Sequence, residues 1–163
     1  MTPARLTRSV MAAATTTDLP LEGAFAGVEH RFPVRVYFED TDLSGVVYHA
    51  NYLRYMERAR SAMLRAAGID QRAAHEAGAG AYAVRDLAIR YLAPAKLDDT
   101  LIVVTRLERI RAASVDIHQR VMRGEVMLTE ARVEAAFVAP TGRPRRQPGE
   151  WVAAFSALVS EGT

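Results

Sequence analysis

Residues 37–60 read YFEDTDLSGVVYHANYLRYMERAR, in which an acidic turn leads directly into a long amphipathic helix. From residue 51 to residue 68 the apolar side chains recur at spacings of three and four, as on a helix that buries one face. This apolar stripe consists of Tyr52, Met56, Ala59, Met63 and Ala67, widened by Leu53 and Leu64. Gly68 is suited to ending the helix. The pattern therefore predicts one long helix, residues 51–68, whose apolar side needs a partner surface.

The segments around this helix alternate with a period of two, which is typical of half-buried strands. A first strand is predicted at residues 31–39, and a short helix with Asp70 as its N-cap at residues 70–76. Further strands are predicted at 87–91, 101–108, 115–121 and 131–137, with a hairpin turn at 123–125 and a closing helix at 149–159. This order is an α+β pattern, and an antiparallel sheet wrapped around the long helix would bury its apolar stripe.

The composition limits the chemistry that the chain can perform. Its 163 residues suffice for one domain, and the absence of cysteine excludes a disulfide framework, a thiol nucleophile and thiolate-ligated metal sites. The net charge of +2 is too small to indicate nucleic-acid binding. No apolar run approaches the roughly 20 residues that span a bilayer. We therefore expect a cytoplasmic protein with a disordered extension over residues 1–28 and a single domain over residues 29–163.

The acidic turn and the start of the helix bring together the groups needed for acyl transfer. Asp42 lies in the turn, and His49 lies where the helix begins. The first backbone N–H groups of a helix lack intrahelical partners and lie at the positive end of the helix dipole, so they can stabilise a carbonyl oxygen that gains negative charge. A carboxylate directed at the same carbonyl can attack it or activate a water molecule. These groups form a minimal acyl-transfer site.

Each of these residues also has a structural interpretation. Asp42 can be a turn former or a helix cap, and His49 can be a packed or capping histidine. Asp40 and Asp42 resemble a metal-binding pair, but no third ligand lies near them in sequence. Glu57 could be a catalytic carboxylate on the helix, although its arginine neighbours favour an ion pair. The chain has no GxSxG, GxxxxGK or GxGxxG motif, and its histidines lack the spacing of a zinc site.

The stretch DTDLSGVVYHANYLRYMERAR at residues 40–60 resembles the signature of the hotdog-fold acyl-CoA thioesterases. Within them it is similar to the branch of 4-hydroxybenzoyl-CoA thioesterase and of the thioesterase associated with the Tol–Pal cell-envelope system. The matching residues are Asp42, Gly45, Val47, Tyr48, His49, Tyr52, Glu57, Ala59 and Arg60. The segment AIRYLAPAKLDD at residues 88–99 resembles a second part of the family pattern, with its proline and paired aspartates. The resemblance covers about residues 31–155 and leaves the N-terminal extension outside.

The resemblance implies a hotdog fold, in which a curved antiparallel sheet of five strands wraps around one long central helix. It implies that subunits pair edge to edge into homodimers or homotetramers, with the active site at the dimer interface. Asp42 matches the catalytic aspartate, acting as nucleophile or as general base. His49 matches the position whose backbone N–H polarises the thioester carbonyl and whose side chain is implicated in catalysis in the Tol–Pal-associated branch. The family needs no metal and no bound cofactor, because coenzyme A is part of the substrate.

The same resemblance suggests which residues contact the substrate. The candidates within the motif are Gly45, Val47, Tyr48, Asn51 and Tyr52. The phosphates of coenzyme A need cationic partners, and Arg109, Arg111 and Arg143 are candidates on an arginine-rich surface.

We therefore expect an acyl-CoA thioesterase that releases a fatty or aromatic acid and free CoA. A hotdog enoyl-thioester hydratase or dehydratase using Glu57 and His49 is one alternative. A non-catalytic binding partner of acyl groups or acyl-carrier protein, at the inner face of the cell envelope, is another. Homodimers or homotetramers are also expected because a lone five-stranded sheet would leave a long edge exposed.

Overall fold

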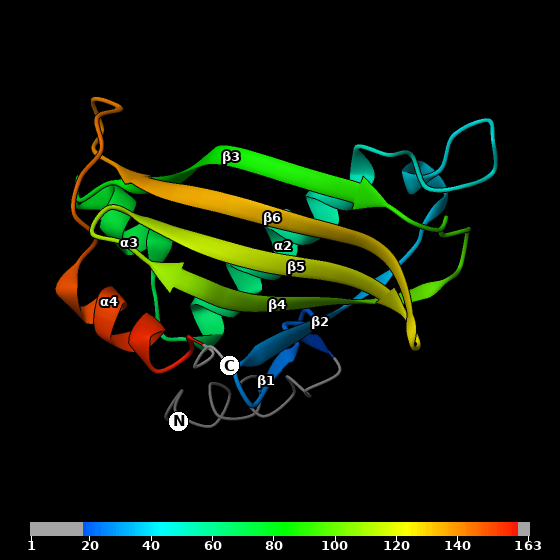
Figure 1. Ribbon diagram of the computed structural model, residues 1–163, viewed down its shortest axis with the longest axis horizontal. Helices are drawn as coiled ribbons and strands as arrows, with labels where there is room; N and C mark the ends of the chain where they lie inside the picture. The colour runs from blue at the N-terminus through cyan, green and yellow to red at the C-terminus, as the bar shows by residue number, and fades with distance from the viewer. Residues whose placement is uncertain (1–17, 160–163) are drawn as a thin grey trace, which may run out of the picture.

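The computed structural model describes residues 18–159, and its core is one long helix enclosed by a curved sheet (Figure 1). In chain order the elements are β1 (Ala24–Ala26), β2 (Glu29–Arg35), the 3-10 turn η3 (Phe38–Asp40), α2 (Asn51–Ala66), α3 (Gln71–Glu76), β3 (Ala81–Tyr91), β4 (Thr100–Ile110), β5 (Ser114–Arg123), β6 (Val126–Val138) and α4 (Gly149–Ser156). The strands pair antiparallel in the order β1-β2-β4-β5-β6-β3. Strand β3, which follows the two helices α2 and α3, therefore forms one edge of the sheet.

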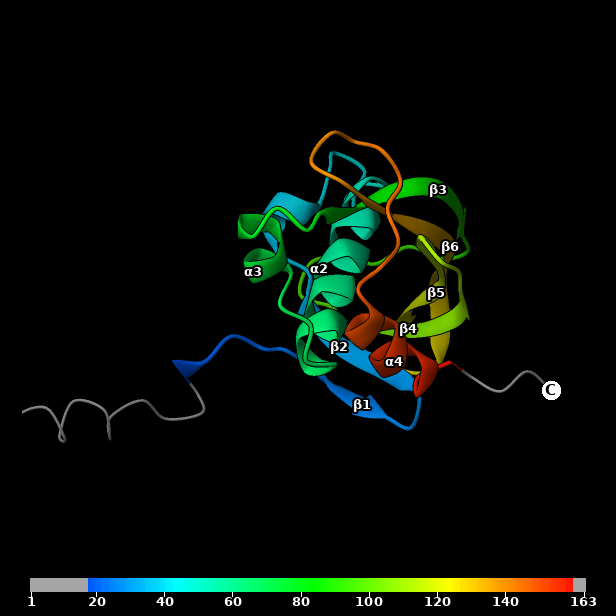
Figure 2. The same ribbon diagram turned by 90° about the vertical axis from the view of Figure 1, so that its left-hand side faces the viewer.

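Helix α2 lies against the concave face of the sheet (Figure 2). Its buried residues are Asn51, Tyr52, Tyr55, Met56, Ala59, Ala62, Met63 and Leu64, which include most of the stripe that the sequence predicts. The inward-facing residues of β4 and β5 alternate along each strand, as in Leu101, Val103 and Leu107. Burying each large apolar side chain of this kind contributes about 1.5–3 kcal/mol. The helix is thus held by the sheet, and its two ends are fixed relative to the strands.

The prediction of the first strand is wrong at its end. Alternation predicts a strand over residues 31–39, but β2 ends at Arg35 and residues 38–40 form η3. The Asp40 carboxylate accepts a hydrogen bond from the Tyr37 backbone N–H at 2.8 Å, and the Asp40 N–H donates to the Tyr37 carbonyl at 3.0 Å. These local hydrogen bonds replace the ladder of a strand. Phe38, which the alternation places in the core, is consequently 82% exposed.

The sheet has six strands rather than the five expected from the sequence. The additional strand β1 lies within the segment assigned to the disordered extension, and its residue Phe25 pairs with His30 of β2. Gly27, with a φ of +62°, begins the two-residue turn of this hairpin. A strand of three residues is too short to show a periodicity. The remainder of the predicted extension, residues 1–17, lies outside the described residues.

The other elements agree with the sequence predictions apart from their lengths. Asp70 caps α3 by accepting a hydrogen bond from the Ala73 N–H at 2.9 Å, as expected. Strand β3 begins at Ala81 rather than at residue 87, and an irregularity in its pairing with β6 falls between Val84 and Asp86. This irregularity breaks the alternation that a sequence pattern needs. No helix within residues 18–159 is both long and apolar enough to cross a membrane.

Candidate active site

The loop between η3 and α2 is closed by backbone hydrogen bonds, and it carries Asp42. The Asp42 N–H donates to the Val46 carbonyl at 3.2 Å, and the Gly45 N–H donates to the Asp42 carbonyl at 3.0 Å. Gly45 has a φ of +82°, a conformation that glycine adopts without strain. The Val47 N–H then donates to the Ala95 carbonyl at 2.9 Å, which ties the loop to the segment after β3. Asp42 therefore has a defined position at the end of the molecule where α2 begins.

Asp40 holds this loop in place through hydrogen bonds of its side chain. Its carboxylate is 5% exposed, and it accepts hydrogen bonds from the Tyr37 N–H at 2.8 Å and from the Asn51 amide at 2.9 Å. Since Asn51 is the first residue of α2, Asp40 fixes the loop to the start of the helix. Burial, together with the negative charge of Asp40, raises the pKa of the neighbouring Tyr55 above its ordinary value. Both oxygens of Asp40 are thus used by protein donors, and Asp42 is the carboxylate left for chemistry.

The Asp42 carboxylate is exposed and is held in its ionised form. Its Oδ1 accepts hydrogen bonds from the Ser44 hydroxyl and from the Ser44 backbone N–H, the latter at 2.8 Å. These two bonds are the main reasons why the pKa of Asp42 lies below its ordinary value, and the nearby His49 lowers it further. Both predicted catalytic residues lie in the segment that leads from η3 into α2. Asp42 is therefore an anion over the whole neutral range.

His49 lies between the rings of Tyr48 and Tyr91, just before the start of α2. The hydroxyl of Tyr91, from the edge strand β3, donates to the His49 carbonyl at 2.8 Å. The His49 ring lies 4.5 Å from that of Tyr48 and 6.3 Å from that of Tyr91, measured between centroids. Tyr52 is buried, and its hydroxyl accepts a hydrogen bond from the Ala95 N–H at 3.0 Å. A groove of about 320 Å³ runs between Val46, His49, Tyr52, Tyr91 and residues 92–94.

The first turn of α2 has no side-chain cap in the structure. The N-cap residue is Ala50, whose side chain cannot accept a hydrogen bond from the first turn. Two amides of this turn already have backbone acceptors, because the Asn51 N–H donates to the Tyr48 carbonyl at 2.8 Å and the Leu53 N–H donates to the Ala50 carbonyl at 3.2 Å. The other amides at the start of the helix, such as that of Tyr52, are donors that a ligand oxygen can use, and they lie at the positive end of the helix dipole. An ionised carboxylate, a helix start without a side-chain cap and an apolar groove are thus found in this part of the molecule, and such groups can support acyl transfer.

Comparisons with known proteins identify the family. The model of the Thioesterase superfamily matches residues 44–130 of this chain. The acyl-CoA thioesterase YbgC of Haemophilus influenzae is 45% identical over 128 residues, which cover 78% of this chain and 94% of that protein. The acyl-CoA thioester hydrolase YbgC of Escherichia coli is 44% identical over 127 residues, which cover 77% and 94%. This chain belongs to the thioesterase superfamily.

A solved structure supports the fold of this thioesterase. The probable thioesterase from Bartonella henselae superposes with a TM-score of 0.70 at 41% identity, covering 74% of this chain and 99% of that one. The similar structures are hotdog-fold thioesterases, so the predicted hotdog fold is confirmed, with one strand more than expected. The region matched by the family model begins two residues after Asp42 and therefore does not include it.

The predicted substrate-contact residues of the thioesterase form two groups, one in the loop and helix start near Asp42 and one made of three arginines. Gly45, Val47, Tyr48, Asn51 and Tyr52 all lie in the loop or in the first turn of α2. Of these, Val47 and Tyr52 line the groove, whereas the Asn51 amide is bound to Asp40. Tyr48 is 45% exposed beside His49. Sequence reasoning missed Ser44 and Tyr91. A serine two residues after an aspartate is a common turn signal, so Ser44 was within reach of sequence analysis.

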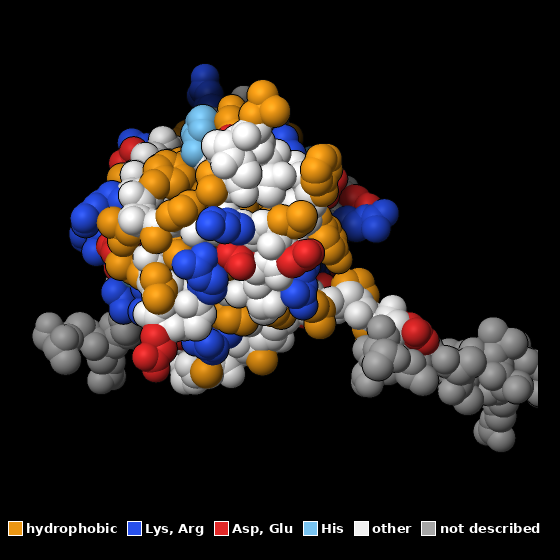
Figure 3. Space-filling model, turned by 90° about the vertical axis from the view of Figure 1, so that its right-hand side faces the viewer, with side chains coloured by type: hydrophobic (Ala, Val, Ile, Leu, Met, Phe, Trp, Pro, Cys, Tyr) orange, Lys and Arg blue, Asp and Glu red, His pale blue; other side chains and the backbone are white. Residues whose placement is uncertain are grey.

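The three arginines predicted to contact coenzyme A lie at the end of the folded molecule opposite to the Asp42 loop. Arg109 is near the end of β4, whereas the opposite end of that strand, at Thr100, pairs with Arg35 near the loop of Asp42. Eleven strand residues span about 35 Å. Arg111 pairs with Asp116 at 2.8 Å, and Arg143 lies in the loop after β6. Within one chain these arginines are therefore not brought to Asp42. Figure 3 shows Lys and Arg side chains among apolar ones on the end of the molecule where the Asp42 loop lies.

Proposed function

We propose that the protein hydrolyses acyl-CoA thioesters, with Asp42 as the catalytic carboxylate and backbone N–H groups at the start of α2 as oxyanion donors. The observation that carries the proposal is the exposed, ionised Asp42 in the loop that leads through His49 into a helix start without a side-chain cap. The names of the Haemophilus influenzae and Escherichia coli relatives support acyl-CoA as the substrate class. The groove between His49 and Tyr91 is lined largely by apolar groups, which suits the acyl part of such a substrate.

In the general-base form of this mechanism, Asp42 removes a proton from a water molecule while the water oxygen attacks the thioester carbon. The carbonyl oxygen becomes negative and is stabilised by the helix amides. The carbon–sulfur bond then breaks, the acid is released, and the thiolate of coenzyme A takes up the proton. In the nucleophilic form, an Asp42 oxygen attacks the carbon, the thiolate leaves, and water hydrolyses the resulting anhydride. Both forms need an ionised Asp42, which its hydrogen bonds to Ser44 favour.

The position of Glu57 disfavours the hydratase or dehydratase alternative. Its carboxylate accepts a hydrogen bond from the Ser61 hydroxyl at 2.9 Å instead of forming the ion pair expected from its arginine neighbours. Glu57 does not line the groove of His49 but a separate cavity further along α2. Within one chain, Glu57 and His49 therefore do not face a common cavity in which both could act on the same substrate.

We also propose that the working unit is a homodimer or a homotetramer joined through β3. This strand is exposed along most of its length, and Val84, Leu87 and Tyr91 are 52%, 36% and 46% exposed. An unprotected edge strand with apolar side chains is a surface that proteins normally cover. Pairing of β3 with the same strand of a second copy would satisfy its free backbone groups and would cover the groove beside Tyr91.

The proposal is tested by thiol release from a panel of acyl-CoAs and acyl-carrier proteins. Wild-type protein should release thiol from at least one acyl-CoA, and Asp42→Asn should lower kcat by at least about a hundredfold, as expected for loss of a base or nucleophile. Carrier-protein thioesters in the same panel show which carrier is preferred. Hydrolysis by Asp42→Asn at a near wild-type rate would eliminate the proposal, and tight binding without turnover would favour the binding-partner alternative. Appearance of ¹⁸O in Asp42 after a single turnover in ¹⁸O-water would establish the nucleophilic form, because general-base catalysis places the label only in the released acid.

A further inference from the structure

A second cavity lies between α2, the inner face of the sheet and α4, further along the helix than the groove of His49. Its volume is about 160 Å³, and its walls are mainly apolar, with Leu64, Leu107, Ile117 and Phe155 among them. An apolar cavity of about 150 Å³ is large enough to hold a benzene molecule. The cavity therefore suits a ligand part of about six carbon atoms.

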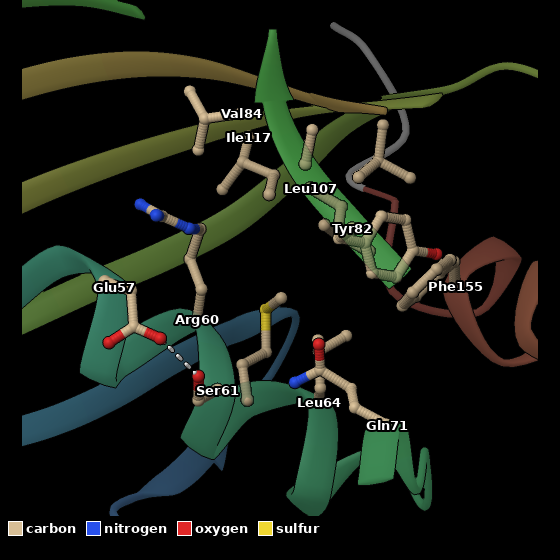
Figure 4. Close-up of a pocket in the computed structure, with 13 residues that line it drawn as sticks. Glu57, Arg60, Ser61, Leu64, Gln71, Tyr82, Val84, Leu107, Ile117 and Phe155 are labelled. Atoms are coloured by element: carbon tan, nitrogen blue, oxygen red, sulfur yellow. Dashed lines mark hydrogen bonds between the residues drawn. The ribbon is translucent and has the colours of Figure 1, made fainter. Parts of the chain in front are cut away.

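Arg60 brings a positive charge to this apolar space. Figure 4 shows its side chain reaching from α2 toward the strands, close to Ile117 and Val84. Its Nη1 donates to the Oε1 of Gln119 at 2.9 Å. Gln119 is itself fully buried. Its amide nitrogen donates to the Met56 carbonyl and to the Thr105 hydroxyl, each at 2.9 Å, which fixes the orientation of the amide. Gln119 therefore holds the guanidinium in one orientation at the wall of the cavity.

The charge of Arg60 is not neutralised by an ion pair. No carboxylate within residues 18–159 lies within 4.0 Å of its guanidinium nitrogens, since Glu57 is turned toward Ser61. A guanidinium has five N–H donors, and Gln119 accepts from one nitrogen. Burial also lowers the pKa of Arg60, although Glu57 opposes this effect. A partly desolvated cation with free donors at an apolar cavity is a ready partner for a carboxylate.

We propose that Arg60 selects acyl groups of about six carbons that carry a carboxylate at the end distant from the thioester. This inference rests on the proposed acyl-CoA hydrolysis and names its substrate class. The apolar walls accept the methylene groups, and the guanidinium of Arg60 binds the terminal carboxylate. The hydrogen bond from Arg60 to Gln119 keeps the guanidinium in place before the substrate arrives, so little side-chain freedom is lost on binding.

The cavity serves the active site of a second copy of the chain. Arg60 lies about 13 Å along the axis of α2 from Asn51, which is too far for so short an acyl group bound at its own chain's Asp42. Val84, at the cavity, and Tyr91, at the groove of His49, lie in opposite halves of the edge strand β3. Antiparallel pairing of β3 between two copies would place the cavity of one chain beside the groove of the other. Each complete site then combines Asp42 of one subunit with Arg60 of its partner.

The first test compares two substrates that differ only in the terminal carboxylate, hexanoyl-CoA and adipoyl-CoA. Wild-type protein should hydrolyse adipoyl-CoA with a kcat/KM at least about tenfold higher, equivalent to about 1.4 kcal/mol. Arg60→Met should lower the adipoyl-to-hexanoyl ratio at least tenfold, whereas Arg58→Met, an exposed arginine of the same helix, should leave the ratio as it is. An equal rate on both substrates in the wild type, or an unchanged ratio in Arg60→Met, would overturn the proposal. If Arg60→Met does not fold, the wild-type ratio alone decides.

A failure of the proposed function gives a different result from a failure of this inference. If neither substrate is hydrolysed, the assignment of the reaction is wrong, and calorimetric binding of the two acyl-CoAs to the wild type still decides the role of Arg60. A preference for adipoyl-CoA supports it, and equal binding overturns it.

The second test uses heterodimers of Asp42→Asn and Arg60→Met subunits, purified through two different affinity tags. One of the two sites in such a heterodimer then combines an intact Asp42 with an intact Arg60 from the other chain. Because half of the sites are intact, adipoyl-CoA hydrolysis should therefore rise at least about fivefold above that of either homodimeric variant. Activity no higher than that of the variants would show that both groups act within one chain and would overturn the shared site.

Discussion

At the level of single residues, Asp40 and Asp42 occupy the same loop but differ in burial and in their hydrogen-bond partners. Asp40 is 5% exposed and accepts from Tyr37 and Asn51, whereas Asp42 is exposed and accepts from Ser44. Replacing Asp40 by Asn leaves one buried donor without an acceptor, which should cost about 2–3 kcal/mol of unfolding free energy. Asp42→Asn should change this free energy by less than about 0.5 kcal/mol. Urea unfolding of both variants checks the contrast, and equal stabilities would show that Asp40 does not anchor the loop.

The hydrogen bonds of Asp42 also predict a pH dependence. Its folded-state pKa lies below the ordinary value of 3.8 because Ser44 donates to its charged form. The active, ionised form is therefore retained as pH falls to 3.8 and is lost only as pH passes below the lowered value. Ser44→Ala removes the hydroxyl donor, so the acidic limb of the kcat/KM profile should move to higher pH. Profiles of both proteins, with circular dichroism at each pH to detect unfolding, test this shift. An acidic limb in the same place in both would show that another group controls it.

The proposed central pair of the site could be named from the sequence, but its surroundings could not. Asp42 and His49 are seven residues apart in one turn-and-helix motif, so local spacing alone brings them together. Tyr91 comes from strand β3, and its bond to the His49 carbonyl depends on how the sheet folds over the helix. Arg60 was part of the family motif, yet its position at a cavity follows from packing against Gln119. A hydrophobic periodicity predicts which side of a helix or strand is buried, but it does not predict which residues of other elements that side contacts.

At the level of elements, the turn before β3 depends on one glycine. Gly80 has a φ of +139°, and a Cβ built at this position would lie 2.4 Å from the Val138 carbonyl oxygen. Gly80→Ala should therefore displace the start of β3 from β6 and lower the unfolding free energy by about 2–3 kcal/mol. Gly78→Ala is the matched control, because Gly78 has a φ of +74° but nothing within 4 Å, so only about 1 kcal/mol should be lost. Thermal or urea unfolding separates the two, and equal losses would show that the close approach to Val138 is unimportant.

The elements differ in how well the sequence predicted them, and the reason is their local regularity. Helix α2 was predicted to within two residues because its apolar stripe repeats over four turns and faces one surface. Strand β1 has three residues and no detectable period, so it was missed. The end of β2 was misplaced because Asp40 holds residues 37–40 in a local turn. A hydrogen bond to a single polar side chain thus set the end of β2, which periodicity alone did not predict.

At the level of the whole molecule, the proposed pairing through the exposed strand β3 would link assembly to activity. Light scattering at micromolar concentration should give twice or four times the 17.9 kDa of one chain. Leu87 lies in the middle of β3 and is 36% exposed, so Leu87→Lys would place a charge in the seam between two copies and should yield monomers. Under the proposal that each complete site combines groups from two subunits, thiol release should fall when the dimer is lost. Val126→Lys, a charge added at a 51% exposed position at the start of β6, is the control that should keep both assembly and turnover. Full activity in a Leu87→Lys monomer would contradict the shared site and leave each chain to act alone.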